Sequence, residues 1–287
     1  MNRFFSRDKK FDIIVVGAGH AGCEAARAAA KLGCTVLLIT FDANKLGLMS
    51  CNPSLGGMGK SHVIKEVDIL GGLMAKAGDA TAIQYRILNR RKGAAVRATR
   101  VQNDRMKYAE KMKELLLPVE NLDVLEDQVT ELIIEDKKVV GVITVKRDVY
   151  ESQKVIICAG TFLDGIIHTG EKKVDAGRYN DPASNFLAHS IRDNHIATRR
   201  FKTGTPARIK ANTIDYSMTT IQHGDEDYFP LSIFSQKLEF AQKPCYITYT
   251  TEETHKMIRE NLNFSAMYSG KIKAKGARYC PSVEDKI

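Results

Sequence analysis

Three observations predict an α/β protein built around a parallel sheet. Near the start, the apolar run FDIIVV at 11–16 leads through a glycine-rich turn into an alanine-rich helix, and a second apolar run, TVLLIT, follows at 35–40. This order is that of a βαβ unit. Alternating strands between residues 124 and 152 then predict a β-meander. Finally, KVIIC at 154–158 has the length and composition of a buried strand that returns to the parallel sheet.

The turn of the βαβ unit carries a GxGxxG pattern, in which each glycine has its own physical role. Gly17 permits the tight turn, Gly19 lets a dinucleotide pyrophosphate approach the backbone, and Gly22 lets the helix pack closely on the strand. The start of the helix presents free N–H groups and a positive dipole end to that pyrophosphate. The expected cofactor contacts are Gly17, Ala18, Gly19, His20, Ala21 and Gly22. Asp42 is the acidic residue nearest the tip of the second strand, where ribose hydroxyls would bind.

Two helices are predicted between the βαβ unit and the meander. A loop too rich in glycine to be helical, GLMSCNPSLGGMG at 47–59, is expected to lie over the cofactor, with Cys51 in its middle. Residues 60–76 then place apolar side chains at helical spacing, namely Val63, Val67, Leu70 and Met74. A second helix is predicted from about Arg100 to Leu117.

Positive charge is concentrated in one stretch, residues 86–113, which we call the basic band. The whole chain carries a formal charge of +9, and the band alone contains ten Lys or Arg residues against Asp104 and Glu110. A localised band of this kind favours a polyanionic partner, although a solvated helix face would give the same pattern. The candidate contacts to such a polyanion, RNA among them, are Arg90, Arg91, Lys92, Arg97 and Arg100.

Composition excludes several other classes of protein. With 44% hydrophobic and 27% charged residues in 287, the chain is neither disordered nor collagenous. No run approaches the roughly 20 apolar residues that span a bilayer, and the basic start lacks a signal-like apolar stretch, so no membrane association and a cytoplasmic location are expected. The six cysteines have neither a CxxC pair nor metal-ligand spacing, so no metal site is expected.

The order of elements suggests a division into domains. A βαβ unit, a meander and a strand ending in a small-residue turn follow one another in glutathione-reductase-like flavoproteins, which favours FAD over NAD as the resident cofactor. We therefore predict an FAD-binding Rossmann domain at 8–204. Residues 205–275 contain the strand-like CYITYTT and a helix opened by TEET at 251–254, and are predicted to form an inserted α+β domain for substrate or NAD. Residues 276–287 would begin the return to the first domain.

Several strings, read together, resemble the MnmG (GidA) family of tRNA uridine 5-carboxymethylaminomethyl modification enzymes. They are GAGHAGCEAA at 17–26, MSCNPSLGGMGK at 49–60, KEVDILGGLMAKA at 65–77, QYRILN at 84–89, AVRATR at 95–100, GTFLDG at 160–165, KTGTPAR at 202–208, CYIT at 245–248 and RYCPSVEDK at 278–286. The resemblance runs in order from about residue 11 to the last residue and covers the N-terminal portion, less than half of the family's usual extent.

The resemblance implies a flavoenzyme that modifies C5 of the wobble uridine in tRNA. Its cofactors would be FAD, NADH and 5,10-methylenetetrahydrofolate as the one-carbon donor, and its partners tRNA, an MnmE-type GTPase and a second copy of the full-length chain. Val129 and Ser184 match further FAD contacts of the family, and Cys51 and Cys280 match its two functional cysteines. The proposed nicotinamide segment matches at Gly276, Arg278, Tyr279, Pro281, Ser282, Glu284, Asp285 and Lys286.

Chemistry supports a role for the two thiols, because C5 of uracil is a poor nucleophile until a group adds at C6 or a base is supplied. A thiolate can add there once positive charge or backbone donors lower its pKa. The sequence does not distinguish whether Cys51 or Cys280 is the nucleophile, and each could be an inert loop thiol. Two other readings stay open: a nonenzymatic fragment that binds a dinucleotide and RNA, and a folate- and flavin-dependent tRNA methyltransferase, which lacks the SCNP and RYCPS strings.

Overall fold

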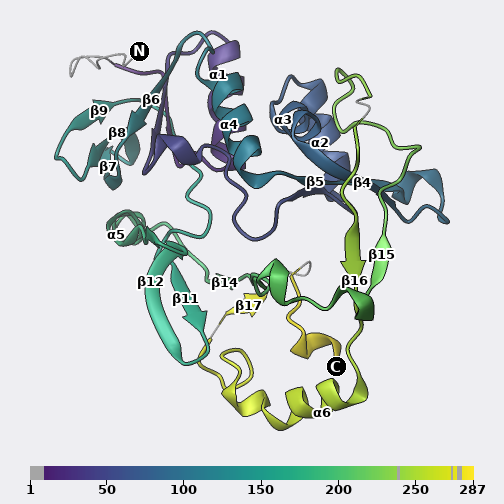
Figure 1. The fold of residues 1–287 in the computed structure, drawn as a ribbon. Coiled ribbons are helices and arrows are strands. Elements are labelled where there is room, and N and C mark those ends of the chain that lie inside the picture. Colours follow the sequence, from purple (N-terminus) through teal and green to yellow (C-terminus); the bar gives the residue numbers. More distant parts are fainter. Residues whose placement is uncertain (1–9, 238–239, 273, 277–279) are drawn as a thin grey trace.

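A four-stranded parallel sheet forms the centre of the first part of the chain. The computed structural model describes residues 10–237, 240–272, 274–276 and 280–287. The sheet has the order β10-β1-β2-β6 (Figure 1), with β1 at Ile13–Val16, β2 at Val36–Thr40, β6 at Leu122–Glu126 and β10 at Val155–Ile157. Its neighbours run parallel throughout, with Ile14 opposite both Leu37 and Val155. The predicted βαβ unit and the returning strand are therefore confirmed.

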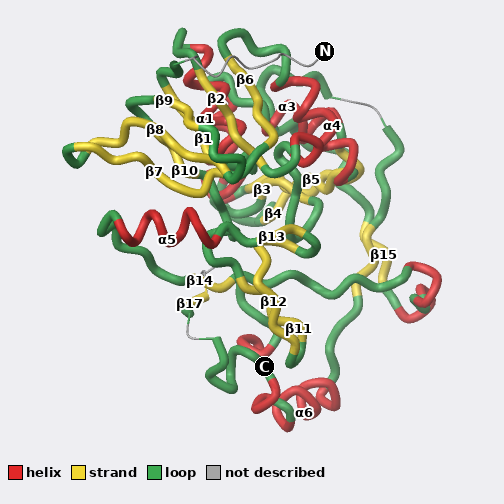
Figure 2. Tube along the Cα trace, turned by 90° about the vertical axis from the view of Figure 1, so that its left-hand side faces the viewer, coloured by secondary structure: helices red, strands yellow, loops and turns green. Residues whose placement is uncertain are grey.

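Both faces of this sheet are buried, which is why its strands read as continuous apolar runs. Val15 and Leu38 face one core cluster, while Ile14 and Leu37 face the other. The first cluster is covered by α1 and α4, and the second by the predicted meander together with α5. These elements are α1 at His20–Lys31, α4 at Arg105–Leu116, β7 at Val129–Glu135, β8 at Lys138–Thr144, β9 at Val149–Glu151 and α5 at Asn185–Asp193. Figure 2 shows α5 lying beside β7.

A second, antiparallel sheet lies beside the first, in the order β3-β5-β4. Its strands are β3 at Ser54–Gly56, β4 at Ala82–Leu88 and β5 at Ala98–Asn103. The expected helix from about Arg100 was therefore wrong at its start, because ATRVQN alternates buried and partly buried side chains as a strand does. Asp104 caps α4 instead, since its carboxylate accepts the backbone N–H groups of Met106 and Lys107.

The predicted helix at 60–76 is two helices, α2 at Lys60–Ile69 and α3 at Met74–Ala80. The chain breaks at Gly71 and Gly72, where Gly71 has φ +93°. The buried face of α2 was also predicted wrongly, because Val63 is 57% exposed and Leu70, which follows the helix, is 87% exposed. Apolar spacing misled here because the helix buries a carboxylate, Asp68, which hydrogen-bonds to the backbone N–H of Ile233 and the hydroxyl of Ser232.

The remaining elements are short. They are β11 at Ile166–Thr169, β12 at Lys172–Arg178, β13 at Asp181–Pro182, β14 at Phe201–Lys202, β15 at Thr220–Gln222, β16 at Cys245–Ile247, α6 at Glu252–Glu260 and β17 at Lys275–Gly276. Of these, β11, β12 and α6 lie in the lower part of Figure 1. The helix predicted from the TEET string is confirmed as α6, whose N-cap Thr251 and Thr254 form a capping box. Two pairings join distant parts of the chain: β14 with β17 in parallel, and β15 with β16 antiparallel.

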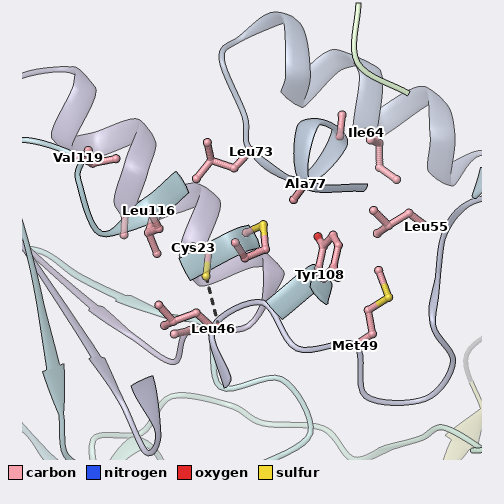
Figure 3. Packing of buried hydrophobic residues seen from close by; sticks show 14 of the residues in the cluster. Cys23, Leu46, Met49, Leu55, Ile64, Leu73, Ala77, Tyr108, Leu116 and Val119 are labelled. Atoms are coloured by element: carbon pink, nitrogen blue, oxygen red, sulfur yellow. Dashed lines mark hydrogen bonds between the residues drawn. The ribbon is translucent and has the colours of Figure 1, made fainter. Parts of the chain in front are cut away.

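The first core cluster extends well beyond the parallel sheet (Figure 3). Tyr108 of α4 is fully buried and lies near Leu55 of β3 and Ala77 of α3. The same cluster takes in Tyr228 and Leu231, from the stretch predicted as an inserted domain. Packing therefore continues from residues below 204 to residues above it, and the predicted domain boundaries stay a prediction. Within the described ranges, no helix combines the length and apolar character needed to cross a bilayer.

Candidate functional site

A cavity of about 280 Å³ opens at the carboxyl ends of β1, β2 and β10. Ligands of open parallel sheets bind at this edge, next to the point where strand order reverses. Three turns line it, each following one strand: Gly17 to His20 after β1, Phe41 to Lys45 after β2, and Cys158 to Phe162 after β10. Val129 at the start of β7 and Ser184 at the N-cap of α5 also line it, and their assignment as FAD contacts stays a prediction.

The glycine turn has the shape of a cradle. A Cβ at Gly17, whose φ is +98°, would lie 2.5 Å from the carbonyl oxygen of Cys158, and a Cβ at Gly22 would overlap the carbonyl oxygen of Gly17. Close packing of the strand and helix therefore requires glycine at both positions. A Cβ at Gly19 would meet nothing within 4 Å, so the space in front of Gly19 belongs to the cavity.

The N-terminus of α1 suits an anionic ligand. Its N-cap Gly19 offers no side chain to the first N–H groups, and the first turn contains no acidic residue. Those N–H groups and the helix dipole therefore face the cavity without competition. Burial lowers the pKa of His20 to about 4, so its imidazole is neutral near pH 7 and adds no charge. The ring lies 5.6 Å from that of Tyr108.

Charged side chains gather where β2 reaches the cavity. Asp42 accepts the backbone N–H of Asn44 at 2.8 Å, and the Lys45 ammonium lies 3.1 Å from its carboxylate. Lys45 also donates to Asp181 at 2.7 Å, and Arg178 donates to the other oxygen of Asp181 at 2.6 Å. Burial raises the pKa of Asp181, but these two hydrogen bonds outweigh burial and leave the pKa lowered. Asp42 therefore lies at the cavity as expected, with its carboxylate shared with Lys45.

The loop that carries Cys51 borders the same cavity. Leu48 and Ser50 line the cavity, and two arginines hold the backbone on either side of Ser50. Arg105 donates from Nε to the carbonyl of Met49 at 2.8 Å, and Arg208 donates from Nη2 to the carbonyl of Cys51 at 2.7 Å. The side-chain amide of Asn52 donates to Cys51 Sγ at 3.3 Å. Cys51 thus follows a residue that lines the cavity, although its own side chain does not line it, and the expectation that the loop covers a cofactor stays a prediction.

Cys280 has the surroundings of a reactive thiol. Its sulfur lies 3.4 Å from the hydroxyl of Thr203 and accepts the backbone N–H of Gly204 at 3.2 Å. These two hydrogen bonds, helped by the charges of Lys202 and Lys60, lower the pKa of Cys280 against the opposing effect of burial. A lowered pKa increases the thiolate fraction near neutral pH.

The rest of the predicted nicotinamide segment lies with Cys280 and away from the cavity lining. Gly276 of β17 pairs with Lys202 of β14, and Asp285 accepts the backbone N–H of Ser282 at 2.7 Å. Glu284 accepts the hydroxyl of Ser265 at 2.9 Å. Pro281 and Lys286 complete the described part of this segment, whereas Arg278 and Tyr279 lie outside the described residues. No structural feature of this segment tests its assignment to NAD, which stays a prediction.

The basic band is divided between two environments. Arg86 forms an ion pair with Asp225 at 2.8 Å, and Arg90 is paired with Asp227, so part of its charge is neutralised. Arg100 lies in β5, where it donates to the hydroxyl of Ser54 at 3.3 Å. The remaining candidates, Arg91, Lys92 and Arg97, are exposed between β4 and β5. This exposed tip is one part of the band that is open to a polyanion, and Lys107 on α4 is exposed as well.

Comparison with known proteins decides the family. The family described as "Glucose inhibited division protein A" (GIDA) matches residues 12–287. The chain belongs to the GidA family. It is 48% identical over 280 residues to the tRNA uridine 5-carboxymethylaminomethyl modification enzyme MnmG of Geobacter sulfurreducens, and 49% identical over 281 residues to that of Thermodesulfovibrio yellowstonii. Each alignment covers 98% of this chain and 45% of the relative. The chain thus spans less than half the length of these GidA relatives.

Solved structures of the family agree with the fold. GidA of Aquifex aeolicus in its form I crystal matches 97% of this chain and 48% of its own, with 43% sequence identity and a TM-score of 0.90. The form II crystal gives 41% identity and a TM-score of 0.87. The α/β class and the resemblance to the GidA family are therefore confirmed, whereas the inserted domain stays a prediction.

Sequence reasoning missed several residues of the cavity. Lys45, Arg178 and Asp181 come from segments more than 130 residues apart, and their ion pairs are visible only in the fold. Phe162 lines the cavity and stacks on Phe41 at 5.5 Å between ring centroids. The turn after β10 could have been found from the sequence, because neighbouring parallel strands bring their carboxyl ends to one edge.

Proposed function

We propose that this chain is the dinucleotide-binding part of an FAD-dependent enzyme that modifies C5 of the wobble uridine in tRNA. The observation that carries this proposal is the position of Cys51. It follows directly after Ser50, which lines the cavity next to the glycine turn at 17–22. The proposal also rests on two relatives that are named tRNA uridine modification enzymes. The activity belongs to the complete family protein, of which this chain spans less than half.

The residues present fit FAD. The helix start at Gly19 would hold the pyrophosphate, because its N–H groups and dipole favour an anion and the space before Gly19 is open. Val129 and Ser184 would contribute further contacts from the cavity wall. When bound, FAD supplies two-electron redox chemistry, for which NADH would be the reductant. The segment from Gly276 to Lys286 is the proposed nicotinamide-binding part.

The chain's own contribution to the reaction would be its two thiols. Addition of a thiolate to C6 of uracil forms an S–C6 bond and moves electron density to C5. C5 then attacks the methylene carbon of methylenetetrahydrofolate, one of the two C–N bonds of that carbon breaks, and the released folate nitrogen keeps the electron pair and takes up a proton. Loss of the C5 proton and of the thiolate restores the uracil ring. Cys51 follows Ser50, which lines the cavity, and Cys280 is supported as a thiolate by Thr203 and Gly204.

Partners follow from the same proposal. The tip that carries Arg91, Lys92 and Arg97 would contact tRNA phosphates, assisted by Arg90 and Arg100. An MnmE-type GTPase and a second copy of the chain would bind the complete protein. The proposed location is the cytoplasm, where tRNA is modified.

The test is a modification assay on this chain completed with the remaining segment of a GidA relative. Cys51→Ser and Cys280→Ser, made separately, should each abolish formation of the modified uridine, read by mass spectrometry of digested tRNA. Cys34→Ser is the control, because Cys34 packs against the core cluster behind α1, and it should retain activity. Full activity in either test variant would remove that thiol from the mechanism. FAD uptake without any tRNA modification would favour the nonenzymatic reading.

A further inference from the structure

One short segment of the chain contacts the regions of both candidate cysteines. Residues 202–208 (KTGTPAR), here called the bridging segment, follow directly from the pairing of β14 with β17. At one end, Thr203 and Gly204 contact the sulfur of Cys280. At the other, Arg208 donates to the carbonyl of Cys51 at 2.7 Å. The two cysteines are 229 positions apart in sequence, and this segment connects their surroundings.

The contacts at Cys280 are directed at the sulfur atom itself. The N–H of Gly204 donates to Sγ at 3.2 Å, and the Thr203 hydroxyl lies at 3.4 Å. A protonated thiol can donate a hydrogen bond, here to the Gly204 carbonyl at 3.6 Å, whereas a thiolate can only accept hydrogen bonds. The arrangement therefore offers a thiolate two donors. The β14 to β17 pairing fixes the backbone from which both donors project, since it ends at Lys202 and Gly276.

The charges around this sulfur also favour its anion. Lys202 has a side chain only 10% exposed, and its ammonium donates to the Cys280 carbonyl at 3.4 Å. Lys60, at the start of α2, adds a second positive charge. Two carboxylates of the following turn lie in the same region: Asp285 forms an ion pair with Lys202 at 4.0 Å and accepts hydrogen bonds from Tyr268 and Ser282, and Glu284 accepts one from Ser265. The pKa of Cys280 is accordingly lowered, with the Thr203 and Gly204 hydrogen bonds as the main causes.

We propose that Thr203 and Lys202 are positioning residues for Cys280. Together with the Gly204 N–H, they hold its sulfur as a thiolate, and the bridging segment fixes the position of that sulfur. The ionisation is simple: the S–H bond breaks, the proton leaves to solvent, and the electron pair stays on sulfur. The inference rests on the proposed function, because a thiolate is the form that adds to C6 of uracil. It adds the residues that prepare that thiol, and it gives the KTGTPAR string a physical role.

The experiment measures the alkylation of Cys280 by iodoacetamide from pH 5.5 to 9, with the peptide that contains Cys280 quantified by mass spectrometry. Neither FAD nor tRNA is added. Thr203→Val removes the hydroxyl and keeps the shape, and it should slow alkylation at pH 7 about threefold. This figure assumes a tenfold smaller thiolate fraction, partly offset by the higher nucleophilicity of the more basic thiolate. Thr203→Ser restores the donor and should restore the wild-type profile.

Two controls and one further test variant complete the experiment. Thr205→Val makes the same change two residues along the bridging segment and should leave the profile unchanged. Cys23, which is fully buried in the core, should stay unmodified in every variant, so its alkylation would reveal unfolding. Lys202→Met tests the charge separately: it should slow alkylation, and because the Lys202 side chain is only 10% exposed, the slowing should persist when the salt concentration is raised.

The proposal is overturned if Thr203→Val and Lys202→Met both leave the pH profile of Cys280 unchanged while Cys23 stays protected. It is equally overturned if Thr203→Ser and Thr203→Val behave alike, since loss of the hydroxyl would then not be the cause. These outcomes are separate from those of the tRNA assay. If the variants shift the alkylation profile but no uridine is modified, the proposed function is refuted and the positioning role stands. If uridine is modified but the variants leave the profile unchanged, the positioning role is refuted and the proposed function stands.

Discussion

Gly19 offers the most selective way to separate ligand binding from folding. Its φ is −70° and a Cβ there would meet nothing within 4 Å, so alanine fits the folded chain. We expect Gly19→Ala to change the free energy of unfolding by less than about 0.5 kcal/mol, because the gain from a stiffer unfolded chain offsets the poorer N-cap. The new methyl group would instead occupy the space where a pyrophosphate meets the helix start.

The expected loss of FAD affinity is at least tenfold, about 1.4 kcal/mol, since one charge-assisted hydrogen bond contributes about that much or more. At an FAD concentration of about 100 times the wild-type Kd, the wild-type chain gains about 2.7 kcal/mol and the variant about 1.4 kcal/mol. Thermal unfolding with and without FAD should therefore show the FAD-dependent rise in Tm fall by about half in Gly19→Ala.

Two further variants define what the result means. Gly22→Ala should lower the Tm without FAD, because its Cβ overlaps the Gly17 carbonyl and overpacking costs about 1–3 kcal/mol or more. Gly93→Ala, in open space away from the cavity, should match the wild type with and without FAD. The reasoning would be refuted if Gly19→Ala lost stability as Gly22→Ala does, or if it kept the full wild-type response to FAD.

Three other predictions follow from the structure. Replacing Arg91, Lys92 and Arg97 together by Gln should weaken tRNA binding and reduce the slope of log affinity against log salt by about 2, whereas Lys137, Lys138 and Arg147 replaced likewise should change little; equal slopes would mean that the tip is only solvated. His20 has a folded pKa of about 4, below its unfolded value near 6.5, so the unfolded chain binds the extra proton. Stability should therefore fall as pH drops from 6.5 to 4, by up to about 3 kcal/mol, and urea titrations of His20→Gln should lack this part of the loss. Asp79→Ala should lower the unfolding free energy by about 3–5 kcal/mol in urea, because it leaves the Tyr85 hydroxyl and the N–H groups of Leu231 and Ser232 unpaired, and a loss no larger than that of exposed Asp193→Ala would contradict this.

The sequence predicted the parts of the fold that depend on local pattern. The βαβ unit, the meander and the capped helix α6 were found because their apolar spacing and turn residues carry the information. The helix at 60–76 was mispredicted because it breaks at Gly71 and Gly72, and because Asp68 is buried to hold the loop at 232–233, a role that no periodicity reveals. Tertiary hydrogen bonds set those faces, and the sequence pattern reflects only apolar burial.

The candidate site divides in the same way. The glycine cradle was predictable because its glycines meet local needs of the turn: a positive φ at Gly17, and space too small for a Cβ at Gly17 and Gly22. The link between Cys51 and Cys280 was not, because it passes through Thr203, Gly204 and Arg208, which contact regions up to 157 positions away. Likewise, the pairing of Arg90 with Asp227 divides the basic band in a way that a charge count along the sequence cannot show.

An equilibrium titration of the purified chain with FAD, followed by quenching of flavin fluorescence, tests the central claim most directly. The cavity behind the glycine cradle predicts saturable uptake at one FAD per chain, weakened at least tenfold by Gly19→Ala and unchanged by Gly93→Ala. A folded chain that leaves flavin fluorescence unchanged throughout the titration would contradict the assignment of this cavity to FAD.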